Sequence, residues 1–250
     1  MVRENYRGAA VAFPAGIAII ASALVALIVL APVFTLADAD VFRPGFGEAL
    51  TYVTGVAFLG MLDDLIGSDR DLPRGWRGHL RALAAGRLST GVLKAAGSLG
   101  LALTVMAAPS KDAGKYLLAV AVLVLATNLF NLLDLRPGRS AKALVLLGIG
   151  LTLGAWKLDP LWGLALFVGP ILVLLPLDLR EVGMLGDTGS NAIGAVAGLW
   201  LVLTLSTLGQ AIAAGVLLLI TVYGEFRSIS ELIERTPGLR QLDLLGRSHA

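Results

Sequence analysis

Long apolar stretches follow one another along most of this chain, and they restrict what it can fold into. A helix needs about 20 apolar residues to cross a bilayer. We place seven or eight stretches of nearly this length, of which the fifth and sixth are short, near residues 9–35, 48–66, 90–108, 115–134, 141–156, 160–177, 190–206 and 208–225. Each is expected to be a helix, because irregular backbone cannot satisfy its hydrogen bonds in lipid. The sequence therefore predicts an all-α polytopic membrane protein with about eight transmembrane helices.

The composition agrees with that class. Of the 250 residues, 56% are hydrophobic and 15% are charged, whereas a soluble domain carries about 25% charged residues. The chain has no Cys, which excludes disulfides, thiol nucleophiles and Cys-ligated metals. The first apolar run is too long for a signal peptide, so we interpret it as a retained span.

The basic residues are spread unevenly over the loops. With the N-terminus in the cytoplasm, the cytoplasmic segments are 1–8, 67–89, 135–140, 178–189 and 226–250. All 20 Lys and Arg residues lie in or beside these segments except Arg43, Lys111, Lys115 and Lys157. The positive-inside rule then predicts that both termini are cytoplasmic. This basic face could attract anionic lipid heads or a phosphorylated substrate, and no feature of the sequence indicates nucleic-acid binding.

The chain divides into two parts. Residues 1–227 are expected to form the transmembrane domain with its cytoplasmic loops, and residues 228–250 a cytoplasmic tail. In the tail, Ile229, Leu232 and Ile233 recur at helical spacing before a TPG sequence. This pattern predicts a short amphipathic helix that lies on the membrane and stops at TPG.

Three polar motifs fall at the cytoplasmic ends of predicted spans. FLGMLDDLIGS ends the second span, NLFNLLD ends the fourth, and MLGDTGSNAIG begins the seventh. Carboxylates at helix ends can simply be solvated. Three motifs at one depth favour a site instead, because ionisable groups at the edge of a span are costly. The candidate residues are Asp63, Asp64, Asn128, Asn131, Asp134 and Asp187.

Carboxylate and amide oxygens suit a hard cation such as Mg²⁺, or Mn²⁺. We therefore expect a metal-assisted phosphoryl-transfer centre at the membrane surface. Thr188 and Ser190 could cap the seventh helix, whose free N–H groups would favour phosphate. Gly189 and Gly194 fit that role or, alternatively, close helix packing.

Basic residues near these motifs are candidates for phosphate binding. The 67–89 loop carries five arginines, including Arg77, and arginine forks suit phosphates. The alternative is a loop that rests on lipid heads. Lys94 sits a few residues into an apolar helix on the same side, where it could reach a phosphate or extend to the interface.

Four segments together resemble one family. NYRGAAVAFPAGI resembles the segment after the family's first span, GMLDDLIG its Asp-Asp motif, NLFNLLD its Asn-x-x-Asn-x-x-Asp motif, and GMLGDTGSNAIG its Gly-Asp-x-Gly-Ser motif. The family is the polyprenyl-phosphate N-acetylhexosamine-1-phosphate transferases, which include the phospho-MurNAc-pentapeptide translocase and the UDP-GlcNAc:undecaprenyl-phosphate transferases. The motifs run in the family's order over nearly the whole chain.

The resemblance implies a bacterial plasma-membrane enzyme, with its active face in the cytoplasm, that works in cell-envelope glycan assembly. It would move a sugar 1-phosphate from a UDP-sugar to polyprenyl (undecaprenyl) phosphate with Mg²⁺, and it would be a dimer. By position, Asp187 and Asn131 would be metal ligands, and Asp63 and Asp64 would act near the lipid phosphate, one as its base. Lys94 would contact phosphates, although it lies farther from Asp64 than the family's lysine. The nucleotide-sugar site would be lined by Asn128 and Asp134.

The chain also departs from the family. The family usually has ten spans, and it often places a second Asp three residues after its first, where this chain has Pro137. Its histidine-rich motif before the last span has no counterpart here. Two functions therefore stay open: a phosphoglycosyl transferase, or a non-catalytic protein on the same scaffold that binds polyprenyl phosphate or a lipid-linked sugar. A transporter is disfavoured, because the acidic groups sit at one face and not at the midplane.

Overall fold

The computed structural model of the chain describes residues 1–67, 89–108 and 112–247. Within these ranges, eight helices of 17 to 21 residues lie where the eight apolar stretches predict them. They are α1 Ile17–Leu36, α2 Phe46–Ile66, α4 Thr90–Met106, α5 Ala113–Leu133, α6 Arg139–Ala155, α7 Asp159–Leu179, α8 Gly186–Thr204 and α9 Thr207–Phe226. The predicted all-helical membrane architecture is confirmed at this level, apart from one small hairpin.

Five of these helices, α1, α2, α5, α7 and α9, are long and apolar enough to cross a membrane. α4 is apolar but shorter, and α6 has only 17 residues. α8 is long enough but opens with the polar GDTGSN sequence. α8 can begin with polar residues because other helices enclose it, and an enclosed helix does not need an apolar surface toward lipid.

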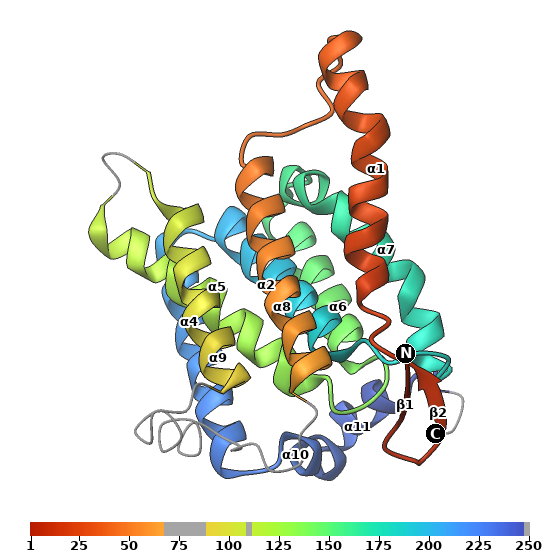
Figure 1. Cartoon of the computed structure of the whole chain (residues 1–250). Coiled ribbons are helices and arrows are strands. Elements are labelled where there is room, and N and C mark those ends of the chain that lie inside the picture. The colour runs from red at the N-terminus through yellow and green to blue at the C-terminus, as the bar shows by residue number, and fades with distance from the viewer. Residues whose placement is uncertain (68–88, 109–111, 248–250) are drawn as a thin grey trace.

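α8 forms the centre of the bundle (Figure 1). Its residues 188–201 are all buried, and it packs mainly against α5 and α2, with α6 and α7 also in contact. Small residues permit this close packing. A Cβ atom on Gly194 would lie 2.7 Å from the Cα atom of Thr127 on α5, so the close-packing alternative is the correct one for this glycine.

The N-terminal segment differs from the prediction. The first span was expected from residue 9, but α1 begins at Ile17. The preceding residues form an antiparallel hairpin of β1 Val2–Glu4 and β2 Ala10–Ala12. A further bridge joins Ala12 to Gly183, just before α8. Pro14 biases Phe13 toward extended backbone, which works against a helix that runs through residues 9–13.

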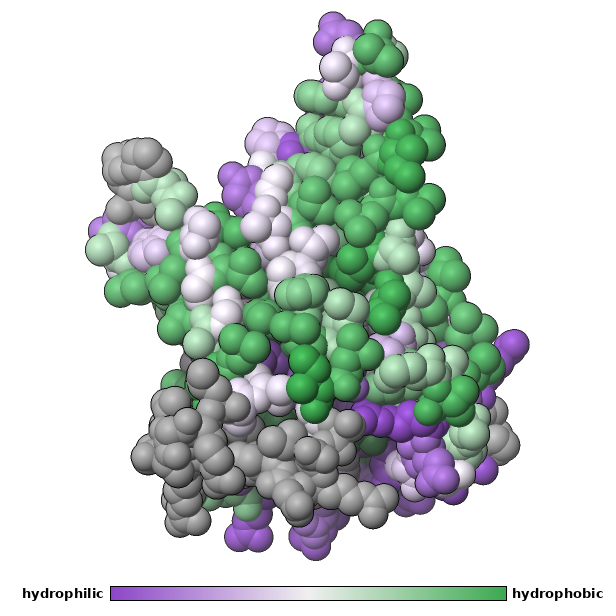
Figure 2. Space-filling model, in the orientation of Figure 1, coloured by the Kyte–Doolittle hydropathy of each residue, from purple (hydrophilic) through white to green (hydrophobic). Residues whose placement is uncertain are grey.

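The tail also differs from the prediction. It contains two short helices, α10 Ile229–Arg235 and α11 Pro237–Leu244. The TPG sequence ends the first, and Pro237 then begins the second, since proline is well suited to the first helical position. The hairpin, α10 and α11 lie at the same end of the bundle (Figure 1). Strongly hydrophilic residues gather at that end, whereas apolar residues cover the sides of the helices (Figure 2).

Candidate functional site

Four helices bring polar side chains together at the end of the bundle that carries the hairpin. The ammonium group of Lys94 on α4 forms ion pairs with Asp187 on α8 and with Asp63 on α2, the latter at 3.3 Å. Asn131 on α5 completes the cluster. With its amide turned to satisfy both ends, its oxygen lies 3.0 Å from Lys94 Nζ and its nitrogen 3.0 Å from Asp187 Oδ1. The three predicted motifs and Lys94 therefore meet at one point.

Asp64 has a different environment from its neighbour Asp63. Its carboxylate accepts hydrogen bonds from the backbone nitrogens of Asp187 and Thr188, each at 2.9 Å, and from the Thr188 hydroxyl at 2.6 Å. Asp64 is thus the cap of α8, supplied by another helix. The expectation that Thr188 and Ser190 cap this helix is wrong, and the N–H groups predicted to attract phosphate are already bonded to a carboxylate.

Close packing at Gly60 makes this contact between α2 and α8 possible. A Cβ atom there would lie 2.3 Å from the carbonyl oxygen of Asp187. Gly60 therefore lets the end of α2 approach the first turn of α8. The adjacent turn of α2 then places Asp63 and Asp64 on the site.

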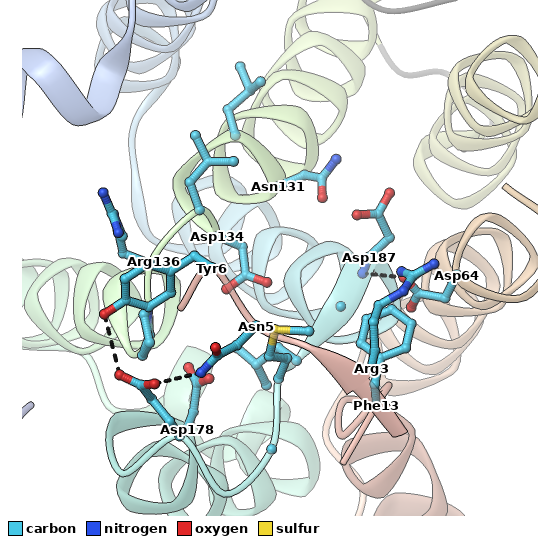
Figure 3. A pocket seen from close by; sticks show the side chains of 18 residues that line it. Arg3, Asn5, Tyr6, Phe13, Asp64, Asn131, Asp134, Arg136, Asp178 and Asp187 are labelled. Atoms are coloured by element: carbon cyan, nitrogen blue, oxygen red, sulfur yellow. Dashed lines mark hydrogen bonds between the residues drawn. The ribbon is translucent and has the colours of Figure 1, made fainter. Parts of the chain in front are cut away.

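A cavity of about 370 Å³ opens beside this cluster (Figure 3). Its volume falls in the range of about 300 to 1,000 Å³ that is usual for small-molecule pockets. Asp64, Asn131, Asp134 and Asp187 line it. Further walls come from the N-terminal segment, the loop after α5, the end of α7 and the α7–α8 connection. Their residues are Arg3, Asn5, Tyr6, Phe13, Arg136, Asp178 and Glu181.

Asp134 lies among these pocket side chains (Figure 3). Its carboxylate accepts no hydrogen bond from any residue that the structure describes. Burial, and then the neighbouring carboxylates of Asp178, Asp187 and Asp64, raise the pKa of Asp134 well above its ordinary value. This carboxyl is therefore available to a ligand hydroxyl or amide.

One predicted site residue stands apart from the pocket, and another lies outside the described residues. Asn128 is exposed on α5 and does not line the cavity. It lies one turn before Asn131, and the bundle turns the second asparagine, not the first, toward α8. Arg77 lies outside the described residues.

The hairpin's part in the pocket was missed from the sequence. Its Asn5 donates a hydrogen bond to Glu181 at 2.6 Å, and Tyr6 donates one to the same carboxylate at 3.3 Å. The Arg136 guanidinium lies 4.4 Å from the centre of the Tyr6 ring. The available signal was the family-like NYRGAAVAFPAGI segment, which was not assigned a role in the site.

The donor set can be tested against the expected Mg²⁺. Among the residues described, no group of three or more His, Cys, Asp and Glu side chains could hold a metal. Mg²⁺ needs only one or two carboxylates, with waters and phosphate oxygens filling its other positions. Asp63, Asp187 and the Asn131 oxygen supply suitable atoms, and these atoms converge on the Lys94 ammonium. The oxygen atoms are therefore of the type that a hard cation prefers, and the Lys94 ammonium contacts the same atoms.

Chemically, the site joins an ammonium group and several carboxylates to a pocket with arginine and aromatic walls. Such a set can bind a phosphate beside a cation and hold a polar organic group next to it. Comparison of the chain with protein-family models, with curated proteins and with solved structures found no match.

Proposed function

We propose that this protein transfers a sugar 1-phosphate from a nucleotide-sugar to a polyprenyl phosphate, with Mg²⁺, at the cytoplasmic face of a bacterial plasma membrane. One observation carries the proposal. Asp63, Lys94, Asn131 and Asp187 come from four different helices and meet beside a 370 Å³ pocket. Phosphoryl transfer depends mainly on positioning and on neutralising charge, and these are the properties that such a cluster provides.

The proposed topology has eight spans and both termini in the cytoplasm. The hairpin and α11 lie at one end of the bundle, which is the arrangement expected for an even number of crossings. The hydrophilic residues gather at the same end. The site would then face the cytoplasm, where nucleotide-sugars are found, and membrane lipids would surround the exposed sides of α1 and α9. Association into a dimer, implied by the family resemblance, stays a prediction.

In the proposed reaction, an oxygen of the lipid phosphate attacks the β-phosphorus of the donor in line. A new P–O bond forms, the bond from the β-phosphorus to the bridging oxygen breaks, and the nucleoside monophosphate leaves with that oxygen. Lys94 would contact the phosphates. Asp63, half-buried and not engaged in capping a helix, is the better candidate of the Asp pair for accepting a proton from the lipid phosphate.

Asp187 and Asn131 would hold the metal ion, with Asp63 beside them. When bound, Mg²⁺ supplies positive charge to phosphate oxygens that two carboxylates would otherwise repel. The pocket would receive the nucleotide part of the donor. Tyr6 and Phe13 offer ring faces there, Arg3 and Arg136 offer positive charge, and Asp134 offers an acceptor for hydroxyl groups.

The second candidate is a non-catalytic protein that binds polyprenyl phosphate or a lipid-linked sugar as a partner in envelope assembly. The observation that favours it is the pairing of Lys94 with both Asp63 and Asp187. This pairing offsets one of the two negative charges without any metal ion. Pro137 also favours the binding protein, because the family often has an acidic residue at that position.

One experiment separates the two. The purified full-length protein is mixed with undecaprenyl phosphate, Mg²⁺ and a panel of nucleotide-sugars, and the release of nucleoside monophosphate is measured. A transferase releases it, and Asp187→Asn abolishes the release. Binding of undecaprenyl phosphate with no release from any donor would reject the transferase and support the binding protein.

A further inference from the structure

The tail and the loop after α5 are joined by a buried ionic cluster. Arg139, at the start of α6, forms two parallel hydrogen bonds with Asp243 on α11, from Nε to Oδ1 at 2.9 Å and from Nη2 to Oδ2 at 3.1 Å. Both side chains are buried, with 5% and 7% of their surfaces exposed. Arg139 also donates to Ser230 on α10 at 2.9 Å. Two-pronged arginine–carboxylate pairs fix orientation as well as distance.

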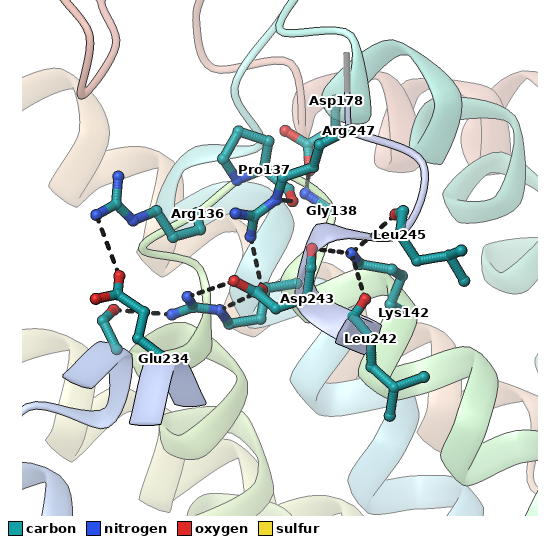
Figure 4. Close-up of polar contacts among 12 residues, drawn as sticks. Arg136, Pro137, Gly138, Lys142, Asp178, Glu234, Leu242, Asp243, Leu245 and Arg247 are labelled. Carbon is teal, nitrogen blue, oxygen red and sulfur yellow. Dashed lines mark hydrogen bonds and ion pairs between the residues drawn. The ribbon is translucent and has the colours of Figure 1, made fainter. Parts of the chain in front are cut away.

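Two more basic residues strengthen the same junction (Figure 4). Arg247 donates to Asp243 at 2.6 Å and to the carbonyl oxygen of Pro137 at 3.1 Å. Lys142 on α6 donates to three carbonyl oxygens at the end of α11, those of Leu242, Asp243 and Leu245. The tail is therefore attached to the bundle, a contact that the sequence did not predict.

The segment held in this way, residues 135–138, is a wall of the pocket, and we call it the wall loop. Leu135, Arg136 and Pro137 all line the cavity. The backbone nitrogen of Gly138 donates to Asp178 on α7 at 2.7 Å, so the loop is fixed on its other side as well. Gly138 has a φ of 71°, a conformation that favours glycine.

Asp134 immediately precedes the wall loop. Because its carboxylate has no hydrogen-bond partner within the described chain, neighbouring side chains do not fix its direction. Its backbone position does, and that position depends on where the loop is held. Among the described residues of the tail, Asp243 is the carboxylate that bonds both arginines of the junction.

We propose that Asp243 is a positioning residue for the pocket. Acting through Arg139 and Arg247, it holds the wall loop, and with it Asp134, in the position that accepts the polar part of the nucleotide-sugar. Only the identity of that ligand rests on the proposed function. The tail thus takes part in shaping the binding site without touching the ligand itself.

The test uses the absence of cysteine in the chain. A single cysteine replaces Leu135, a wall-loop residue whose side chain is 59% exposed, and carries a spin label in the full-length protein in nanodiscs. In Asp243→Asn, the label is expected to move at least about threefold faster, because Arg139 loses its charged partner. A reference label at Leu219, exposed on α9, should keep its mobility.

The matched control is Glu231→Gln. This change also removes one carboxylate from the tail, but Glu231 pairs with Arg235 on the same helix and not with the wall loop. It should leave the Leu135 label unchanged. If Asp243→Asn does not fold, Arg247→Met serves instead, since it removes the contact with Pro137.

Binding of each nucleotide-sugar in the panel is measured on the same samples. Asp243→Asn should raise the Kd of the one that binds at least about tenfold while Glu231→Gln does not. An unchanged label at Leu135 in a folded Asp243→Asn or Arg247→Met protein would overturn the positioning role. A faster label in a protein whose wild type binds no nucleotide-sugar would support that role and count against the proposed function alone.

Discussion

The carboxylate of Asp64 on α2 binds Thr188 on α8 twice, accepting hydrogen bonds from its backbone nitrogen at 2.9 Å and from its hydroxyl at 2.6 Å. This contact joins residues 124 positions apart. The contact fixes the position of α8 along the bundle axis relative to α2. It therefore also fixes how far along that axis Asp187 lies from Asp63. The two adjacent aspartates therefore have separate tasks, one in assembling the site and one in facing it.

Replacing each aspartate by asparagine should separate these tasks. Asp64→Asn turns an amide N–H₂ toward one of its donors and leaves that donor unsatisfied, so it should lower the free energy of unfolding by about 1–3 kcal/mol. Asp63→Asn leaves Lys94 paired with Asp187, so it should lower the free energy of unfolding by less than Asp64→Asn does while abolishing transfer. Thermal unfolding in detergent measures the first effect, and equal destabilisation by both changes would contradict the division.

Lys94 should compete with divalent metal for the same oxygen atoms. Lys94→Met removes the ammonium group that pairs with Asp63 and Asp187. Since a unit charge within 4 Å interacts by about 4 kcal/mol near a protein surface, we expect Mn²⁺ to bind at least about tenfold more tightly. Electron paramagnetic resonance titration of Mn²⁺ measures this without any substrate.

The control for that titration is Asp187→Asn, which should weaken Mn²⁺ binding because it removes a donor oxygen. Mn²⁺ affinity that stays the same in both variants would place the cation elsewhere.

Gly60→Ala should damage the site through packing alone. The added Cβ would lie 2.3 Å from the Asp187 carbonyl oxygen, so α2 and α8 must separate. Overpacking of this kind costs about 1–3 kcal/mol. Gly100→Ala on α4 is the matched control, because its Cβ would meet no atom within 4 Å and alanine favours the helix. Equal unfolding temperatures for the two variants would show that the helices do not approach so closely.

The junction between the tail and the wall loop should fail only in acid. Burial raises the pKa of Asp243, but the hydrogen bond and charge of Arg139, followed by the charges of Arg247 and Lys142, lower it more, and the net pKa is below the ordinary 3.8. A carboxyl with a lowered pKa contributes stability above its ordinary value and loses it as the pH falls through the folded one. The Leu135 spin label should therefore gain mobility in a step below about pH 4, and this step should be missing in Asp243→Asn. The same change below about pH 4 in both proteins would assign the junction to another group.

Cysteine labelling of intact cells tests the orientation. A cysteine at Lys157, exposed between α6 and α7, should react with an impermeant reagent added outside. A cysteine at Glu231 on the tail should react only after the cells are opened. The reverse pattern would place the site on the outer face.

The helices and the meeting of the three motifs could be predicted because both follow from the apolar runs. Once the spans alternate in direction, Asp63, Asn131 and Asp187 must come to the same end. The division of labour between Asp63 and Asp64 could not be predicted, because neighbours on a helix point about 100° apart and only the rotation of α2 against α8 selects between them. The same holds for Asn128, which the rotation of α5 turns away from the pocket.

The hairpin and the tail junction could not be predicted from the sequence for another reason. The strands have only three residues each and depend on a bridge to Gly183. The Arg139–Asp243 pair joins residues 104 positions apart. Contacts of this range leave no periodic pattern, so no local reading of the chain can reveal them.

The enclosure of α8 limits how this protein can change over evolution. The helix that carries Asp187 is also the packed centre of the bundle, with residues 188–201 buried. A substitution there that alters the chemistry also alters the packing, so this side of the pocket can vary little without loss of the fold. The opposite side consists of the hairpin and the wall loop, whose side chains are partly exposed. New ligand preferences would therefore arise mainly through changes in those two segments.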